Sequence, residues 1–83
     1  MSKLKYIINQ IDQFMIFPPA VQHVDAARLL MGKFGPDVVS GGFIDISNNE
    51  VNCYGESISL NLKSRGDIDS QIIAVNFDLN VGR

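Results

Sequence analysis

Only one histidine, His23, occurs in the 83-residue chain, and it follows an apolar segment that stops at Pro18 and Pro19. Imidazole is the side chain that most readily exchanges a proton near neutral pH. His23 is therefore the one candidate for a general base, or for a residue that contacts a phosphate group. The competing interpretation is a half-buried histidine that packs over Ala27, because many perturbed titratable groups are structural.

A second candidate is the segment around Gly55, where a turn could direct backbone amides toward one point. The amides of Ser57, Ile58 and Ser59 follow this glycine, and successive amides of this kind can hold phosphate oxygens. An ordinary turn between two strands is the competing interpretation. The segment becomes a candidate site only if it lies beside His23.

The acidic residues and the cysteine do not form a metal site in the sequence. The nine acidic residues are dispersed, and no spacing typical of metal ligands joins them to His23. We therefore expect neither a metal nor a cofactor. Cys53 is the only cysteine, so it cannot form an intramolecular disulfide, and its neighbours Val51 and Tyr54 predict a buried thiol in a strand.

The composition is typical of a small folded protein. Hydrophobic residues make up 46% of the chain and charged residues 19%, and the length predicts one domain, residues 1–83, with a modest core. The net charge of -2, with scattered basic residues, argues against nucleic-acid binding. No apolar run approaches the roughly 20 residues that span a membrane, so we expect a cytoplasmic protein without membrane contact.

Residues 3–17 precede His23, and the pattern of their apolar residues is ambiguous. The spacing fits a helix, but the residue types favour a hairpin with strands Lys5–Asn9 and Gln13–Phe17. We predict the hairpin.

The segment Ala20–Phe34 is amphipathic and predicts a helix. Pro19 suits the first turn, and Gly35 suits the end. His23 would then lie near the start of the helix and point toward the body of the protein. The positive end of the helix would keep its imidazole neutral and ready to accept a proton.

A second hairpin is predicted for Val38–Ile46 and Val51–Tyr54, with a turn between them. Gly41 and Gly42 indicate either a bulge or a close approach of another backbone, and curvature of the sheet over the helix is the explanation that we favour. The next segment, Ser57–Lys63, alternates as a strand or an extended loop would. Its expected inward side chains are Ile58, Leu60 and Leu62.

The last part of the chain predicts a short helix and a final strand. Ser64 and Asp67 have the spacing of a capping box, in which a hydroxyl and an acid satisfy each other's backbone amides. An apolar helix face follows, and then an alternating segment. The residues of the helix face are Ile68, Ile72 and Val75, and those of the strand are Phe77, Leu79 and Val81. The complete pattern predicts an α+β fold, with two helices packed on a small mixed sheet built from hairpins.

Four motifs occur in a recognisable order: Leu4–Tyr6, Gln22–Asp25, Gly41–Ile44 and Val51–Ser57. Their order and spacing resemble those of the Janus/Ocnus family, the phosphohistidine phosphatases, in a compact and divergent version. The similarity covers most of the chain. Small bacterial and phage proteins of unassigned function are similar in the same motifs.

The resemblance implies a phosphatase-like site. His23 would be the general base that activates water, and Lys5 would contact the phosphate. The amides of Ser57, Ile58 and Ser59 would form the oxyanion cradle, with no metal or cofactor. The implied substrate is a phosphorylated peptide side chain or a small phosphoester.

Two positions depart from the family pattern. A basic residue of the family is Phe43 here, and a tyrosine before the histidine is Gln22. Loss of a positive charge would weaken phosphate binding. The alternative function is therefore a non-catalytic module, encoded by a phage or another mobile element, that binds a protein partner through a sheet edge or a helix face.

Overall fold

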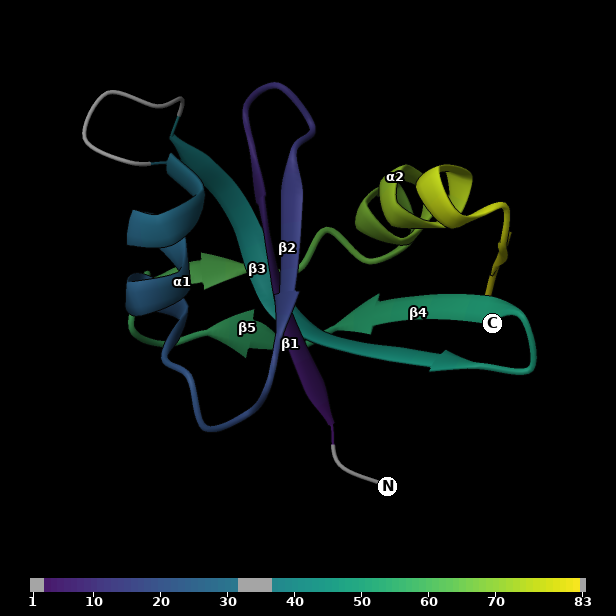
Figure 1. Cartoon of the computed structure of the whole chain (residues 1–83), viewed down its shortest axis with the longest axis horizontal. Coiled ribbons are helices and arrows are strands. Elements are labelled where there is room, and N and C mark those ends of the chain that lie inside the picture. Colours follow the sequence, from purple (N-terminus) through teal and green to yellow (C-terminus); the bar gives the residue numbers. More distant parts are fainter. Residues whose placement is uncertain (1–2, 32–36, 83) are drawn as a thin grey trace.

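The computed structural model describes residues 3–31 and 37–82, which form the predicted α+β fold. A five-stranded mixed sheet in the order β2-β1-β3-β4-β7 lies at the centre, and β5 and β6 form a second, two-stranded sheet (Figure 1). The elements are β1 (Leu4–Asn9), β2 (Phe14–Phe17), α1 (His23–Met31), β3 (Val38–Ser47), β4 (Glu50–Tyr54), β5 (Glu56–Ser57), β6 (Leu62–Lys63), α2 (Asp67–Phe77) and β7 (Asn80–Val81). Within the described residues, no helix is long and apolar enough to cross a membrane.

The two helices cover opposite faces of the central sheet (Figure 1). Successive side chains of a strand point to opposite faces, so β1 contributes to two cores. Tyr6 and Ile8 belong to the cluster that contains Ile73 of α2, and Ile7 belongs to the cluster that contains Ala26 of α1. All five side chains are fully buried. β1 is therefore the strand that joins the two halves of the molecule.

Both predicted hairpins are confirmed. β1 pairs with β2 in antiparallel register, which excludes a continuous helix over residues 3–17. β3 pairs with β4 through a turn in which Asn48 and Asn49 have φ angles of 51° and 62°. Asparagine tolerates this left-handed conformation, and two such residues form the tight turn that suits the twist of a hairpin.

The paired glycines of β3 mark a close backbone approach. A Cβ atom on Gly42 would lie 2.5 Å from the carbonyl oxygen of Tyr54, and one on Gly41 would lie 3.2 Å from that of Tyr6. Of the two interpretations of these glycines, the close approach is therefore the one that the structure supports. A side chain at Gly42 would push β4 away from β3.

Helix α1 begins later than predicted, at His23. Pro19 lies in a preceding turn that the Val21 amide closes by donating to the carbonyl oxygen of Pro18 at 3.1 Å. The placement of Pro19 in the first helical turn was wrong, because this turn takes up the residues before Gln22. The predicted end of the helix, Phe34 and Gly35, lies outside the described residues.

The predicted alternation over Ser57–Lys63 holds only in part: Leu60 and Leu62 are partly buried between exposed neighbours, but the start of the segment differs. β5 ends at Ser57, and the chain reverses in a turn that the Asn61 amide closes on the Ile58 carbonyl oxygen at 3.1 Å. Ile58 is therefore 87% exposed instead of inward-facing. Leu60 packs on the α1 side of the molecule.

The start of α2 is stabilised differently from the predicted capping box. Gly66 is the N-cap residue, so no side-chain hydrogen bond from this position caps the helix. The Ser64 hydroxyl oxygen accepts the amide of Gly66 at 3.0 Å, and the acid that reaches back is Asp69, whose carboxylate accepts the amide of Arg65 at 2.9 Å. The acid that reaches back is therefore Asp69, two residues further into the first turn than Asp67.

The apolar face expected for α2 is only partly buried: Ile72 packs against the core cluster, but the other two residues are turned toward solvent. Ile68 is 59% exposed and Val75 is 69% exposed. The buried positions of the helix are Asp69, Ser70, Ile73 and Ala74. The helix also extends to Phe77, which removes this residue from the predicted final strand and leaves β7 with two residues.

Candidate functional site

The candidate site is built on one row of side chains that crosses four strands. Phe17 of β2 lies opposite Lys5 of β1, Lys5 lies opposite Phe43 of β3, and Phe43 lies opposite Tyr54 of β4. Directly opposed residues share a face of the sheet. Lys5 is two residues from Ile7, so this row faces α1.

His23, at the start of α1, packs onto this row. Its ring is nearly perpendicular to those of Phe17 and Phe43, with centroid distances of 5.3 and 6.4 Å. Its Nε2 lies 2.9 Å from the carbonyl oxygen of Gly42. Only 5% of the residue is exposed, so His23 points into the protein as predicted but is buried instead of half-buried.

The contact with Gly42 fixes how the imidazole can act. A carbonyl oxygen only accepts hydrogen bonds, so Nε2 carries the proton that is donated to Gly42. Nδ1 then becomes the basic nitrogen of the neutral ring, and no hydrogen bond among the described residues occupies it. The ring is therefore fixed through one nitrogen and keeps a free lone pair on the other.

The environment also favours the neutral form of His23. Burial lowers the pKa of His23 most strongly, and the charge of Lys5 lowers it further, while the hydrogen bond to Gly42 acts in the opposite direction. The direction agrees with the sequence-based expectation. The main cause differs, because desolvation of the ring, and not the positive end of the helix, is the largest contribution.

An open pocket of about 450 Å³ lies over this row. It gathers residues from β1, from the start of α1, from β3 and from the turn of the β5–β6 hairpin. The lining residues are Lys5, Gln22, His23, Phe43, Gly55, Glu56, Ile58 and Ser59. The structure thus brings together four of the residues singled out in the sequence: Lys5, His23, Ile58 and Ser59. We call this cavity the His23 pocket.

Ser57 lies outside the lining of the His23 pocket. It is buried, and its hydroxyl oxygen accepts the amide of Leu60 at 3.3 Å. The amide of Ser64 donates to Gly55, so Gly55 and Ser64 form a hydrogen-bonded pair. Hydrogen-bonded and non-hydrogen-bonded pairs alternate along an antiparallel ladder. Ser57 and Leu62 lie two positions further along, so they again form a hydrogen-bonded pair, in which the Ser57 amide donates to Leu62. Ser57 therefore shapes the turn and does not present its amide to the pocket.

The remaining donors of the pocket have unused capacity. The Lys5 ammonium donates to the carbonyl oxygen of Val21 at 3.0 Å and has two further N–H groups. Ile58 and Ser59 lie in the turn, where no hydrogen bond among the described residues uses their amides. An ammonium and two turn amides are suitable donors for an anion.

Glu56 is the pocket residue that was not singled out from the sequence, whereas Phe43 and Gln22 were noted there as departures from the family pattern. Phe43 owes its place to strand register, which pairs it with Lys5. Gly55 allows the Phe43 ring to lie close to the backbone, because a Cβ atom at Gly55 would lie 2.9 Å from that ring. The φ angle of Gly55 is 78°, which also favours glycine. Glu56 follows this glycine directly. The only sequence signal that Glu56 belongs to the pocket was its position directly before the candidate amides of Ser57, Ile58 and Ser59.

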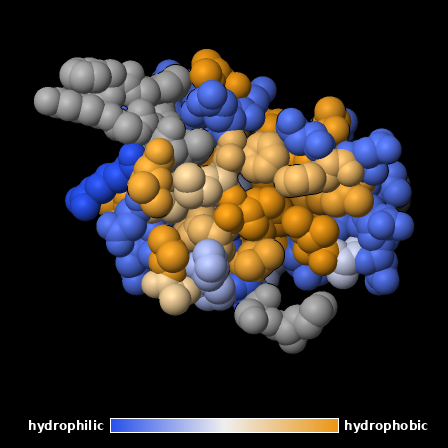
Figure 2. Space-filling view, in the orientation of Figure 1, coloured by the Kyte–Doolittle hydropathy of each residue, from blue (hydrophilic) through white to orange (hydrophobic). Residues whose placement is uncertain are grey.

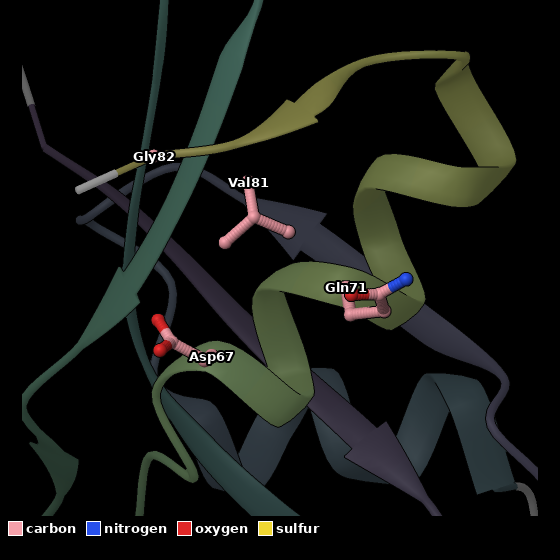
Figure 3. Close-up of a pocket in the computed structure, with 4 residues that line it drawn as sticks. All are labelled: Asp67, Gln71, Val81 and Gly82. Atoms are coloured by element: carbon pink, nitrogen blue, oxygen red, sulfur yellow. The ribbon is translucent and has the colours of Figure 1, made fainter.

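A second, larger pocket of about 510 Å³ lies between α2 and β7. Figure 3 shows Asp67 and Gln71 on α2, with Val81 directed between them from β7 and Gly82 beyond it. None of the described residues that line it is a histidine, cysteine or lysine. No group of three or more potential metal ligands occurs in the described parts of the chain. The His23 pocket is thus the better candidate for chemistry.

Comparisons with protein-family models, with curated proteins and with solved structures found no match to this chain.

Proposed function

We propose that the His23 pocket binds the phosphoryl group of a phosphorylated peptide side chain or a small phosphoester in the cytoplasm and hydrolyses it. The observation that carries this proposal is the convergence of Lys5, His23 and the turn at Ile58 and Ser59 around one cavity. These segments are far apart in the sequence. They are also the segments whose motifs resemble those of the phosphohistidine phosphatases.

His23 would act as the general base. Its Nε2–H donates to Gly42, which holds the ring in one orientation and leaves Nδ1 as the proton acceptor. The lowered pKa keeps the ring neutral near physiological pH, as a general base requires. Water would attack phosphorus and transfer its proton to Nδ1 while the bond from phosphorus to the leaving group breaks. The leaving group then takes up a proton.

Lys5 and the turn amides would hold the phosphoryl oxygens. The ammonium would supply a charge, and the Ile58 and Ser59 amides would supply directional donors from the turn of the β5–β6 hairpin. Donors that are fixed before the reaction stabilise the negative charge of the transition state more effectively than mobile ones. Phe43 and Ile58 would add apolar contacts beside the bound group.

The test is hydrolysis of a phosphohistidine peptide and of an aryl phosphate by the wild type and by His23→Gln. Glutamine is preferred to alanine, because its amide can still donate to Gly42 and fills part of the buried space. Loss of a general base lowers the rate about 100-fold to 10,000-fold. Gln71→Ala, on the far pocket, is the control and should retain full activity.

Two results would contradict the proposal. One is a wild-type protein without hydrolysis above the buffer rate and without a phosphate-induced NMR shift at His23. The other is a His23→Gln protein that is folded and equally active. A histidine with a packing role would instead lower the melting temperature on substitution without any change in chemistry.

A second candidate function is a non-catalytic interaction module, and the outward apolar face of α2 favours it. Helices that are apolar on two faces are usually buried, yet Ile68 and Val75 are mostly exposed and Phe77 is 52% exposed. Figure 2, drawn in the orientation of Figure 1, shows further apolar surface at the centre of the molecule, between the two helices. The Phe77 ring packs edge-on against that of Phe14 in β2, with ring centroids 5.8 Å apart.

The partner that we infer for this face is a second copy of the chain. Identical apolar patches can pair across a two-fold axis, and twofold dimers are the commonest oligomers. Sedimentation velocity over a range of concentrations should then show a dimer that Val75→Ser weakens. A monomer at all concentrations would exclude this arrangement.

A further inference from the structure

The charges that line the His23 pocket cancel. Lys5 contributes one positive charge and Glu56 one negative charge, while burial keeps His23 neutral by lowering its pKa. A lining without net charge does not favour a phosphate dianion. If the pocket binds phosphoryl groups, as proposed above, a further cation should lie close to it.

Lys3 is held near the edge of the pocket by two aromatic rings. Its ammonium lies 5.8 Å from the ring centroid of Phe43 and 6.0 Å from that of Tyr54. The two rings are stacked, with centroids 5.9 Å apart and an interplanar angle of 27°. An ammonium within about 6 Å of a ring is attracted to the electron-rich face. The lysine is exposed, but this contact gives its charge a preferred position.

The link to the pocket is Phe43. One side of this residue lines the cavity with His23, and the same ring attracts the Lys3 ammonium. Lys3 directly precedes β1, two residues before Lys5, and its ammonium lies over Phe43, which shares a face of the sheet with Lys5. The two ammonium groups therefore flank the aromatic wall of the pocket.

We propose that Lys3 is a second anion-binding residue of the His23 pocket, positioned by Phe43 and Tyr54. With Lys3 included, the charged groups at the pocket carry a net positive charge, and without it they carry none. The pair of lysines would favour a doubly charged phosphate over a singly charged anion. This inference rests on the proposed phosphoryl-binding function and adds the residue that sets its preference for charge.

The experiment is an NMR titration with inorganic phosphate at low ionic strength, followed at His23 and at the Ile58 and Ser59 amides. Lys3→Gln should weaken phosphate binding about two- to fivefold, as expected for loss of one exposed charge. Lys3→Arg should retain the affinity, because it keeps both the charge and the ring contact. Nitrate, which carries one charge, should bind more weakly than phosphate to the wild type, and this difference should shrink in Lys3→Gln.

Two further variants separate position from overall charge. Arg28→Gln is the control, because Arg28 is exposed on α1 and pairs with Asp25 at 3.6 Å, away from the pocket lining. It removes the same charge and should leave phosphate affinity unchanged. Tyr54→Leu keeps every charge but removes one of the two rings beneath Lys3, and should weaken binding in the same direction as Lys3→Gln.

The outcomes distinguish this inference from the function on which it rests. Wild-type protein that binds phosphate with the same affinity as Lys3→Gln would overturn the role of Lys3 alone. Equal losses in Lys3→Gln and Arg28→Gln would also overturn it, since the effect would then reflect net charge. Wild-type protein that binds no phosphate would overturn both proposals.

Discussion

Asp69 and His23 are both buried polar side chains, but the structure uses their hydrogen-bonding capacity differently. Asp69 is fully buried, and both carboxylate oxygens are occupied: Oδ1 accepts the Arg65 side chain at 2.7 Å, and Oδ2 accepts the Arg65 amide and the Tyr6 hydroxyl. Among the residues that the structure describes, His23 forms one hydrogen bond, to Gly42, and none occupies Nδ1. Satisfied groups stabilise a fold, whereas a positioned group with spare capacity can act on a ligand.

The Asp69 network joins the two ends of the chain. Tyr6 lies on β1, and its hydroxyl meets the Asp69 carboxylate at 2.5 Å and the Ser64 hydroxyl at 2.6 Å. Burial, followed by the hydrogen bond to Asp69, raises the pKa of Tyr6, so its hydroxyl keeps its proton and remains a donor. The network therefore fixes the start of α2 on the strand that also carries Lys5.

Among the polar substitutions, the largest loss of stability is expected for Asp69→Asn. One carboxylate oxygen becomes an NH₂ group that faces donors from Tyr6 or Arg65, so at least one buried contact turns repulsive. Hydrogen bonds to charged groups contribute about 1.5 to 3 kcal/mol each, and we expect a loss of unfolding free energy in this range. Urea denaturation measures it. A change below about 0.5 kcal/mol, the usual size of a surface substitution, would show that the network is not structurally important.

Tyr6→Phe should have a smaller effect. The ring remains in the core, and only the hydroxyl between Asp69 and Ser64 is lost. The expected decrease in unfolding free energy is about 0.5 to 1.5 kcal/mol, typical of one hydrogen bond. The double variant with Asp69→Asn provides the control, because residues in one network should give less than the sum of the two single losses. Strict additivity would mean that the two side chains act independently.

The pH dependence of the unfolding free energy tests the neutral state of buried His23, the other side chain of the comparison. The pKa of His23 is lowered in the folded protein, whereas an unfolded histidine titrates near about 6.5. As the pH falls below this value, the unfolded state takes up the proton first, so the unfolding free energy decreases until the pH reaches the folded pKa. Above about pH 6.5 the histidine contributes no slope.

This decrease is measured by urea denaturation between about pH 7 and about pH 5, above the range in which carboxylates titrate. His23 is the only histidine of the chain, so His23→Gln should remove the slope. A slope that persists in the variant would assign it to another group. A flat profile in the wild type would show that the neutral ring is not favoured by folding.

The parts of the fold that the sequence predicted depend on neighbouring residues. The hairpins follow from β-branched and aromatic segments joined by short turns, and the turn at Asn48 and Asn49 has residues that tolerate positive φ angles. The burial of Cys53 followed in the same way from its strand neighbours and is confirmed. In these segments local preference and tertiary packing agree.

The parts that the sequence did not predict depend on distant partners. The orientation of α2 is set by Asp69, whose partner Tyr6 lies 63 residues away, and no local pattern identifies that contact. The aromatic wall of the His23 pocket depends on the register that places Phe43 beside Lys5. His23 and the turn at Ser59 could be named as candidates from residue type, but their proximity required the fold.

The smallest effect is expected for Ile68→Ser, at the residue directly before Asp69. Periodicity places Ile68 on the apolar face of α2, but the structure leaves it 59% exposed while Asp69 is fully buried. We therefore expect a change in unfolding free energy within about 0.5 kcal/mol, measured by urea denaturation at low protein concentration. Ile73→Ala is the matched control on the buried face and should cost about 2 to 5 kcal/mol. A loss at Ile68 as large as that at Ile73 would mean that α2 is rotated, with its isoleucine stripe against the sheet, and the comparison between Asp69 and His23 would then lose its structural basis.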